Sequence, residues 1–177
     1  MNGMTLVKPS MEYDRQIQAC RKEFLDFGGT MDGSSALRLF GNTQDWLDHL
    51  ETLGNPETVP AGKPLRKQYI YVREEDGKVA GLLNIRPQFN EYLEKYGGNI
   101  GYCVCPGERR KGYATGMLKA ALPLCRELGL KKVLISCIQG NEGSRRTILN
   151  NGGVYESAVW YEEKQIWLER YWISLEE

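Results

Sequence analysis

The stretch GYCVCPGERRKGYAT, from Gly101 to Thr115, constrains the fold of this chain more than any other segment. It starts with β-forming residues, is interrupted at Pro106, and passes into an apolar pattern with helical spacing from Gly112 onward. A strand, a turn and a helix are therefore predicted in direct succession. With 177 residues the chain can bury one sizeable core, so we predict a single domain over residues 1–177.

The turn between this strand and this helix predicts a phosphate-binding site. It contains Arg109, Arg110 and Lys111, and it leads to Gly112 at the expected helix start. The first amides of a helix have no partners within the helix, and the helix dipole adds partial positive charge there. A phosphate or pyrophosphate would satisfy those amides and pair with the cations. From these residues alone, a solvated basic turn with a conformationally required glycine is the alternative interpretation.

The other elements follow from apolar periodicity and from glycine and proline breaks. Helices are predicted over residues 11–27, 43–53, 89–96, 112–128 and 141–150. Strands are predicted over residues 5–8, 68–72, 79–85, 133–138, 154–162 and 164–173, besides the strand that precedes Pro106. Residues 75–77, between two of these strands, predict a hairpin, and Pro123 predicts a local kink in its helix.

The motif Arg109-x-x-Gly112-x-Ala114 resembles the Q/R-x-x-G-x-G/A signature of the GCN5-related N-acetyltransferase (GNAT) family, and Val104-x-Pro106 precedes it at the family's usual distance. Further segments similar to the family's are residues 132–136, 141–144 and 151–153. The resemblance implies an α/β GNAT fold, with a central mixed and twisted sheet of about seven strands flanked by about four helices.

The same resemblance, specific over residues 100–155, implies that acetyl-CoA is the acetyl donor; no metal is expected beside it. In this family acetyl-CoA binds where two neighbouring parallel strands diverge, and its pantetheine arm would pair here with the exposed backbone of Cys103 and Val104. An amide near Val104 would stabilise the oxyanion. The implied acetyl-CoA-binding residues are Cys103, Val104, Arg109, Arg110, Lys111, Gly112, Tyr113, Ala114, Thr115, Asn141 and Ser144.

The chain lacks the proton-transfer residues that the family often uses. Ile148 occupies the position of the usual tyrosine acid, and Gly98 or Asn99 aligns with a glutamate found in some members. An amine with a pKa of about 10 must lose a proton before it attacks, and a leaving thiolate benefits from an acid. The substitute candidates are Tyr155 and Tyr102 as acids and Glu91 or Glu94 as a base acting through water. Ordinary surface or packing roles are the alternative for each, and direct attack with little acid assistance remains open.

The expected activity is acetylation of a primary amine on a small molecule or a protein. The alternative is a catalytically impaired module that binds or senses acetyl-CoA. A nucleotide-phosphate binder of another fold is disfavoured, because neither G-x-G-x-x-G nor G-x-x-x-x-G-K-[ST] occurs. The aromatic residues Trp46, Tyr92, Trp160 and Tyr161 either form a wall of the amine site or belong to the core or an interface.

Composition excludes several other classes. The 23 basic and 23 acidic residues balance, which argues against nucleic acid or membranes as partners. No long apolar segment or signal peptide is recognised, so a cytoplasmic location is expected. The five cysteines are expected to be reduced core residues, and with His49 as the one histidine a zinc site has few ligands. The aromatic strands over residues 160–172 suggest an edge for a homodimer.

Overall fold

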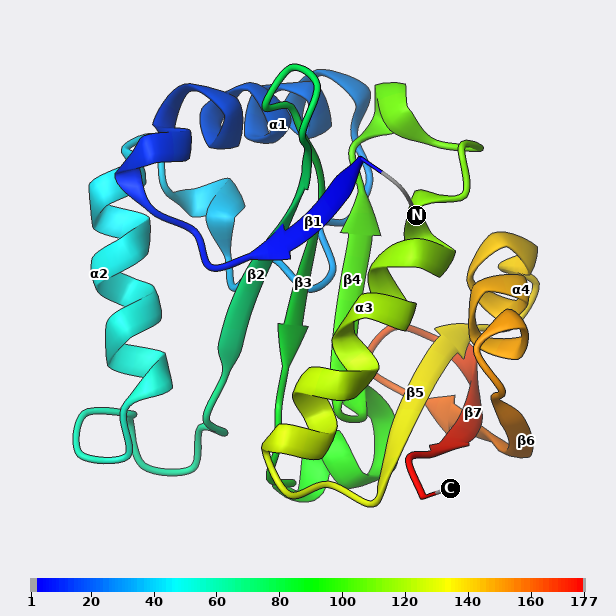
Figure 1. The fold of residues 1–177 in the computed structure, drawn as a ribbon. Helices are drawn as coiled ribbons and strands as arrows, with labels where there is room; N and C mark the ends of the chain where they lie inside the picture. Colours follow the sequence, from blue (N-terminus) through cyan, green and yellow to red (C-terminus); the bar gives the residue numbers. More distant parts are fainter. Residues whose placement is uncertain (1–2, 177) are drawn as a thin grey trace.

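The computed structural model describes residues 3–176, and Figure 1 shows strands of a twisted sheet with helices packed around them. The elements are β1 (Met4–Val7), α1 (Asp14–Phe27), α2 (Thr43–Gly54), β2 (Lys67–Arg73), β3 (Val79–Ile85), β4 (Ile100–Val104), α3 (Tyr113–Glu127), β5 (Lys132–Ile138), α4 (Glu142–Asn150), β6 (Val154–Tyr161) and β7 (Ile166–Ser174). Short 3-10 segments cover Met11–Tyr13, Leu37–Leu39 and Pro106–Glu108, and a π-helical turn covers Leu93–Gly97. Within residues 3–176, no helix is both long enough and apolar enough to cross a bilayer.

The strands form two antiparallel sheets that meet at one point. One sheet has the order β1-β2-β3-β4 and the other the order β5-β7-β6. The amide of Asn99 donates to the carbonyl of Leu134 at 2.7 Å, and the amide of Leu134 donates to the Asn99 side chain at 2.8 Å. Beyond this junction β4 and β5 run in the same direction and diverge (Figure 1). The predicted mixed sheet is thus confirmed, with the junction between its halves open at one end.

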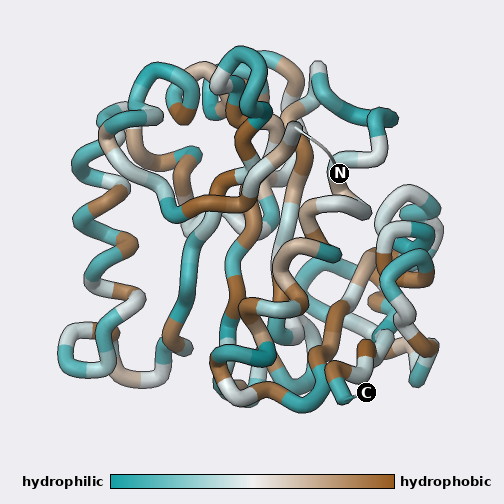
Figure 2. Tube along the Cα trace, in the orientation of Figure 1, coloured by the Kyte–Doolittle hydropathy of each residue, from teal (hydrophilic) through white to brown (hydrophobic). Residues whose placement is uncertain are grey.

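The central strands are buried on both faces, because successive residues along β2 and β3 are buried regardless of the face they point to. On one face Ile70 and Leu82 pack against α1 and against Trp46 of α2. On the other face Leu83 and Ile85 pack against α3 and the second sheet. Figure 2 shows apolar residues alternating with polar ones along the covering helices, as expected for helices with one buried face.

Two predicted helices differ from the structure in detail. The segment from Met11 begins as a 3-10 turn before α1, and the segment predicted over 89–96 ends as the π-helical turn Leu93–Gly97. Asn90 starts this turn, because its side-chain oxygen accepts from the Leu93 amide at 2.9 Å. Helix α3 continues through Pro123 to Glu127. The hairpin between β2 and β3 is confirmed.

The prediction of five reduced cysteines is wrong for one pair. Cys20 on α1 and Cys105, directly after β4, form a disulfide across a sequence separation of 85 residues, with their Cα atoms 5.9 Å apart. The prediction considered spacing along the chain, whereas the pair is brought together by packing of α1 against the sheet. Cys103, Cys125 and Cys137 are free thiols.

Candidate active site

The N-terminus of α3 presents backbone amides without partners. Gly112 precedes the helix with a φ of +80°, in the left-handed region that favours glycine. The Gly116 amide donates to the Gly112 carbonyl at 3.1 Å, which is the first hydrogen bond of the helix. The amides of residues 113–115 donate to no acceptor among residues 3–176. Together with the helix dipole, these N–H groups supply the free donors and the partial positive charge that the predicted phosphate site needs.

The three cations of the turn have different surroundings. The Arg109 guanidinium lies over the ring of Phe27 at 5.0 Å. The Lys111 ammonium group forms an ion pair with the buried carboxylate of Glu108, with 2.8 Å between Nζ and Oε2. Burial opposes the charged form of Glu108, but hydrogen bonds from Lys111 and neighbouring cations outweigh it and lower the pKa of the carboxyl group. Arg110 forms no ion pair within residues 3–176, so Arg109 and Arg110 are the cations available to a ligand.

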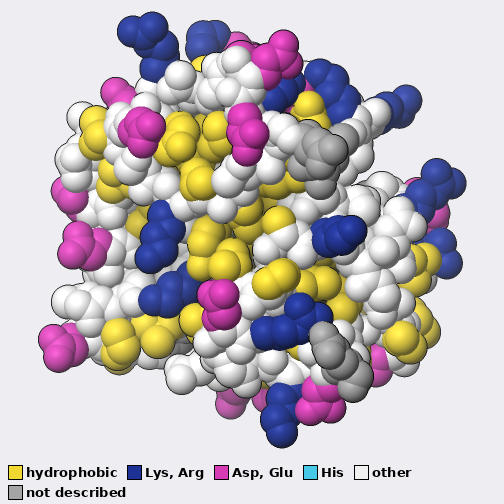
Figure 3. Space-filling view, viewed as in Figure 1, with side chains coloured by type: hydrophobic (Ala, Val, Ile, Leu, Met, Phe, Trp, Pro, Cys, Tyr) yellow, Lys and Arg dark blue, Asp and Glu magenta, His cyan; other side chains and the backbone are white. Residues whose placement is uncertain are grey.

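A cavity of about 500 Å³ opens beside this helix start, where β4 and β5 diverge. Its volume lies in the range of small-molecule sites. Figure 3 shows the outline of the molecule indented at this place, with Lys and Arg side chains on both rims. The structure brings together here all of the predicted acetyl-CoA-binding residues except Lys111: Cys103, Val104, Arg109, Arg110, Gly112, Tyr113, Ala114, Thr115, Asn141 and Ser144.

Strand β4 turns half of its backbone groups toward this cavity. The amide of Cys105 donates to the carbonyl of Ala80 on β3 at 2.8 Å. The pairing of β3 with β4 continues from this bond without a register shift. Because hydrogen bonding alternates along an antiparallel pair, the backbone of Cys103 also faces β3. The backbone groups of Tyr102 and Val104 face away from β3, toward the opening. Val104 therefore has a free outward amide, while its outward carbonyl accepts a hydrogen bond from the Arg109 guanidinium at 3.3 Å. The backbone of Cys103, which was also expected to be free, pairs with β3.

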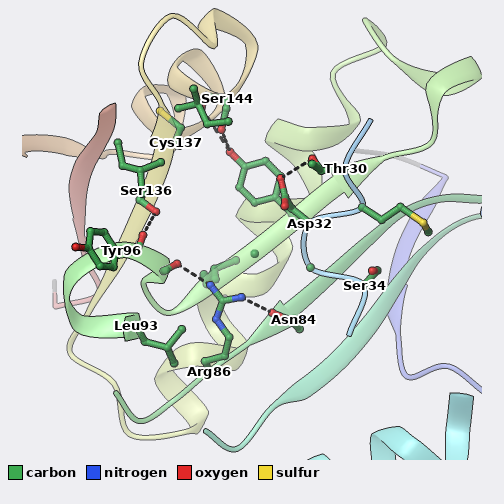
Figure 4. Close-up of a pocket in the computed structure, with 18 of the residues that line it drawn as sticks. Thr30, Asp32, Ser34, Asn84, Arg86, Leu93, Tyr96, Ser136, Cys137 and Ser144 are labelled. Atoms are coloured by element: carbon green, nitrogen blue, oxygen red, sulfur yellow. Dashed lines mark hydrogen bonds between the residues drawn. The ribbon is translucent and has the colours of Figure 1, made fainter. Parts of the chain in front are cut away.

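A second cavity, of about 570 Å³, adjoins the first. Its walls come from the loop after α1, from β3 and β4, from the π-helical turn, and from β5 and β7 (Figure 4). The residues that line both cavities are Thr30, Asp32, Tyr102, Asn141 and Ser144. A group bound in one cavity would meet a group bound in the other along this shared wall.

Tyr102 is the sequence-predicted catalytic candidate that lies on the shared wall. Its hydroxyl is 2.7 Å from the Ser144 hydroxyl (Figure 4). Burial raises the pKa of Tyr102 to about 12, the Ser144 hydrogen bond opposing the shift. The phenol is therefore neutral at physiological pH and can donate a hydrogen bond. Asn141 positions Ser144, because its side chain accepts the Ser144 amide at 3.2 Å and caps α4.

Asp32 is a shared-wall residue that the sequence analysis missed. It lies in the loop between α1 and α2, to which no element was assigned, and accepts a hydrogen bond from the Thr30 hydroxyl at 3.2 Å. The loop crosses β4 directly, since a Cβ on Gly33 would lie 2.2 Å from the Gly101 carbonyl oxygen. The Gln68 side chain holds the Gly33 carbonyl at 2.7 Å. The sole local signal was a carboxylate beside a glycine in a loop.

The other catalytic candidates lie elsewhere. Tyr155 on β6 is half exposed and packs edge-on against Tyr171 at 5.7 Å between ring centroids. Glu91 and Glu94 are exposed. None of these side chains lines either cavity, so the structure does not bring them to the shared wall. Ile148, at the family's tyrosine position, is fully buried.

The aromatic residues divide between the second cavity and other places. Tyr92 and Tyr161 line it, with their ring centroids 6.0 Å apart. Trp46 belongs to the core and donates its indole N–H to Ser34 at 3.0 Å. Trp160 stacks edge-on against Trp167 outside both cavities. The expectation of an aromatic wall therefore fits two of the four residues.

This fold and site define a class of protein in which two cavities share one wall, and one of them opens at a helix start where parallel strands diverge. A sequence profile described as "Acetyltransferase (GNAT) family" matches residues 41–152, and the chain belongs to this family. The resemblance over residues 100–155 is thereby confirmed.

Solved structures of the same fold support the assignment. Spermidine N-acetyltransferase from Vibrio cholerae, a dodecamer, aligns over 99% of this chain and 95% of its own with a TM-score of 0.66 and 12% identity. The microcin C7 self-immunity acetyltransferase MccE, solved with acetyl-CoA and AMP, aligns over 98% and 93% with a TM-score of 0.68 and 16% identity. At these identities the likeness concerns the fold. The comparison with curated protein sequences found no match.

Proposed function

We propose that the protein is an acetyl-CoA-dependent N-acetyltransferase that transfers an acetyl group to a primary amine by direct attack. The observation that carries the proposal is the row of unpartnered amides at residues 113–115, which opens into a cavity lined by the residues that the family motif implies. Membership in the acetyltransferase family and the acetyl-CoA complex of MccE support it.

The chain's residues fit acetyl-CoA. The amides of residues 113–115 would take the pyrophosphate, with Arg109 and Arg110 beside them, and a bulkier residue at Gly112 would be strained because its φ is positive. The outward carbonyl of Val104 would pair with the pantetheine arm in exchange for the hydrogen bond that it now accepts from Arg109 at 3.3 Å. When bound, acetyl-CoA supplies a thioester: the amine nitrogen bonds to the acetyl carbonyl carbon while the C–S bond breaks and CoA leaves as a thiolate.

Asp32 is the group best placed to handle the proton of the amine. Its carboxylate attracts an ammonium group to the shared wall, and because Asp32 is exposed it can relay the released proton to water. An alkylamine has a pKa of about 10, so the acceptor reaches its neutral form by losing a proton to solvent before it attacks.

Tyr102 assists the leaving group by hydrogen bonding. With a pKa of about 12, its phenol holds its proton more tightly than a thiol with a pKa of about 8.5. Full proton transfer to the thiolate is therefore uphill, and the phenol acts mainly as a donor that stabilises negative charge on sulfur. The outward amide of Val104 is the donor available to the acetyl oxygen.

Calorimetry with acetyl-CoA and a thiol-release assay with an amine panel test this proposal. Saturable binding below ~100 µM together with amine-dependent thiol release is the expected result. Absence of binding at that concentration would overturn the proposal. Tight binding with no turnover on any amine would instead favour an acetyl-CoA-binding or sensing module.

A further inference from the structure

The second cavity is lined by an excess of positive charge. Arg38, Arg66, Arg86 and Lys164 line it, while Asp32 is its one carboxylate within residues 3–176. None of these four cations forms an ion pair with a residue of that range. Unpaired cations that face a cavity favour an anionic ligand and repel a polycationic one.

Arg86 is fixed in place by neutral acceptors. Its guanidinium donates to the Gly97 carbonyl at 2.6 Å, to the Gly98 carbonyl at 3.2 Å and to the Asn84 side chain at 3.0 Å (Figure 4). Burial, and then the neighbouring charge of Arg66, lower the pKa of Arg86 to about 10. The group is still charged at neutral pH, held rigidly and without a counter-ion in the described chain.

Arg66 carries a buried donor that is not satisfied. Its Nε is buried and has no hydrogen-bond partner within residues 3–176, and burial lowers the pKa of this guanidinium also. A buried N–H without an acceptor is costly, and a planar guanidinium is suited to binding a carboxylate or phosphorus oxyacid through two hydrogen bonds. Within the described residues, Arg66 thus lacks a hydrogen-bond acceptor, and both guanidinium groups lack a counter-ion; an anion would supply both.

We propose that the acceptor amine carries an acidic group that binds Arg66 and Arg86, while its amino group faces Asp32 and Tyr102. This inference rests on the proposed acetyltransferase function, because it names the acceptor of that same site. Tyr92, Tyr96 and Tyr161 stack together on another wall, with 4.6 Å between the ring centroids of Tyr96 and Tyr161. The acceptor class is therefore a free amino acid with an apolar or aromatic side chain, or its phosphonate analogue.

Acceptor pairs that differ only in the acidic group test this inference. L-Leucine is compared with isoamylamine, and L-phenylalanine with phenethylamine. Two further compounds are tested: spermidine, as a polycation, and the analogue of leucine in which a phosphonate replaces the carboxylate. Binding is measured by calorimetry and saturation-transfer NMR, with and without acetyl-CoA, and turnover by thiol release. We expect the acidic member of each pair to bind at least ~10-fold more tightly than its decarboxylated partner, and spermidine to bind more weakly than either. The leucine and phosphonate arms show which acid is preferred.

Substitutions of the two arginines localise the effect. Arg66→Gln and Arg86→Gln should reduce the preference for the acidic member to nearly equal affinities while acetyl-CoA affinity is unchanged. Arg146→Gln, at an exposed arginine outside both cavities, is the matched control. Should Arg86→Gln unfold by thermal melting, because Arg86 also ties down Gly97 and Gly98, Arg66→Gln carries the test.

The outcomes separate this inference from the proposed function. Equal binding within each pair, a preference for spermidine, or no binding by any acidic acceptor would overturn the inference even where acetyl-CoA binds. Failure of acetyl-CoA to bind would overturn the proposed function, while selective binding of the acidic member without acetyl-CoA would still establish the anion site.

Discussion

The two cavities present different chemistry: the cavity at the start of α3 is the donor side of the proposed reaction, and the second cavity is its acceptor side. The cavity at the start of α3 offers backbone amides, which any helix places in the same way when small residues such as Gly112 and Ala114 stand beside them. The second cavity offers side chains, Arg66, Arg86 and Asp32, from three separate segments. A site made of backbone keeps its ligand as the sequence changes, whereas a site made of side chains changes its ligand with single substitutions. In the proposed function, this difference would let the acceptor change while the donor stays the same.

The two regions are also held in place differently. The donor side is cross-linked by the Cys20–Cys105 disulfide, directly after β4. The loop that carries Asp32 is held by a buried hydrogen-bond network, in which the Ser35 hydroxyl donates to Gln68 at 2.6 Å and accepts from Asn84 at 3.2 Å. Substitutions can therefore affect one region and leave the other intact.

The largest expected effect is on stability, from loss of the disulfide. Cys20→Ala/Cys105→Ala should lower the free energy of unfolding by about 4.5 kcal/mol through the loop entropy of an 85-residue closure, besides the small cost of the lost side-chain atoms. Urea unfolding followed by circular dichroism measures it, with Cys125→Ala, at a buried free thiol, as the control. Equal stability of the oxidised and reduced wild-type protein would show that the cross-link contributes nothing.

An added negative charge at the helix start should act on the donor cavity alone. Ala114→Asp is compatible with the first turn of a helix, but its carboxylate repels phosphate and competes for the amides. We expect acetyl-CoA affinity to fall about 100-fold, or ~2.7 kcal/mol, with amino-acid binding to the second cavity unchanged. Calorimetry with both ligands measures this, and Ala120→Asp, exposed on the same helix, is the control. An unaltered acetyl-CoA affinity would place the phosphates elsewhere.

The donor side could be predicted from the sequence because nearly all its determinants lie close together in it. The strand, the glycine and the cations fall within residues 101–115, and Asn141 and Ser144 follow as the cap of the next helix. Helix and strand assignments were mostly correct for a related reason, since periodicity and glycine or proline breaks are local.

The acceptor side could not be predicted because each of its residues is unexceptional in its own segment. Arg66 precedes β2, Arg86 follows β3, and Asp32 lies in a loop without any periodic pattern. Their meeting depends on packing across the sheet, as does the pairing of Cys20 with Cys105. Tyr102 belongs partly to each side. Its place on β4 could be predicted from the neighbouring residues, but its contact with Ser144 could not, because that contact depends on how α4 packs.

Gly33→Ala should weaken acceptor chemistry while leaving the free amides at the start of α3 in place. The new Cβ would collide with the Gly101 carbonyl, 2.2 Å away, and displace the loop that carries Asp32. We expect kcat/KM to fall about 10- to 100-fold, as for a displacement of catalytic groups by about 1 Å, with acetyl-CoA affinity unchanged. Gly29→Ala is the matched control, because Gly29 also has positive φ but has no atoms within 4 Å of the new Cβ. Equal losses of kcat/KM in both variants would mean that strain from the positive φ is responsible, and not the collision with the Gly101 carbonyl.

The smallest effect is expected at Tyr102, where the two cavities meet. If its phenol only donates a hydrogen bond to sulfur, Tyr102→Phe should lower kcat about tenfold or less and leave acetyl-CoA affinity nearly unchanged. Since the pKa of Tyr102 is about 12, the phenol stays protonated up to about pH 10, and the wild-type rate should rise with pH as the acceptor amine loses its proton. Rate profiles of both proteins from pH 6 to 10 measure this. A wild-type rate that falls above pH 8, with the fall abolished in the Phe variant, would make Tyr102 a true proton donor with a much lower pKa.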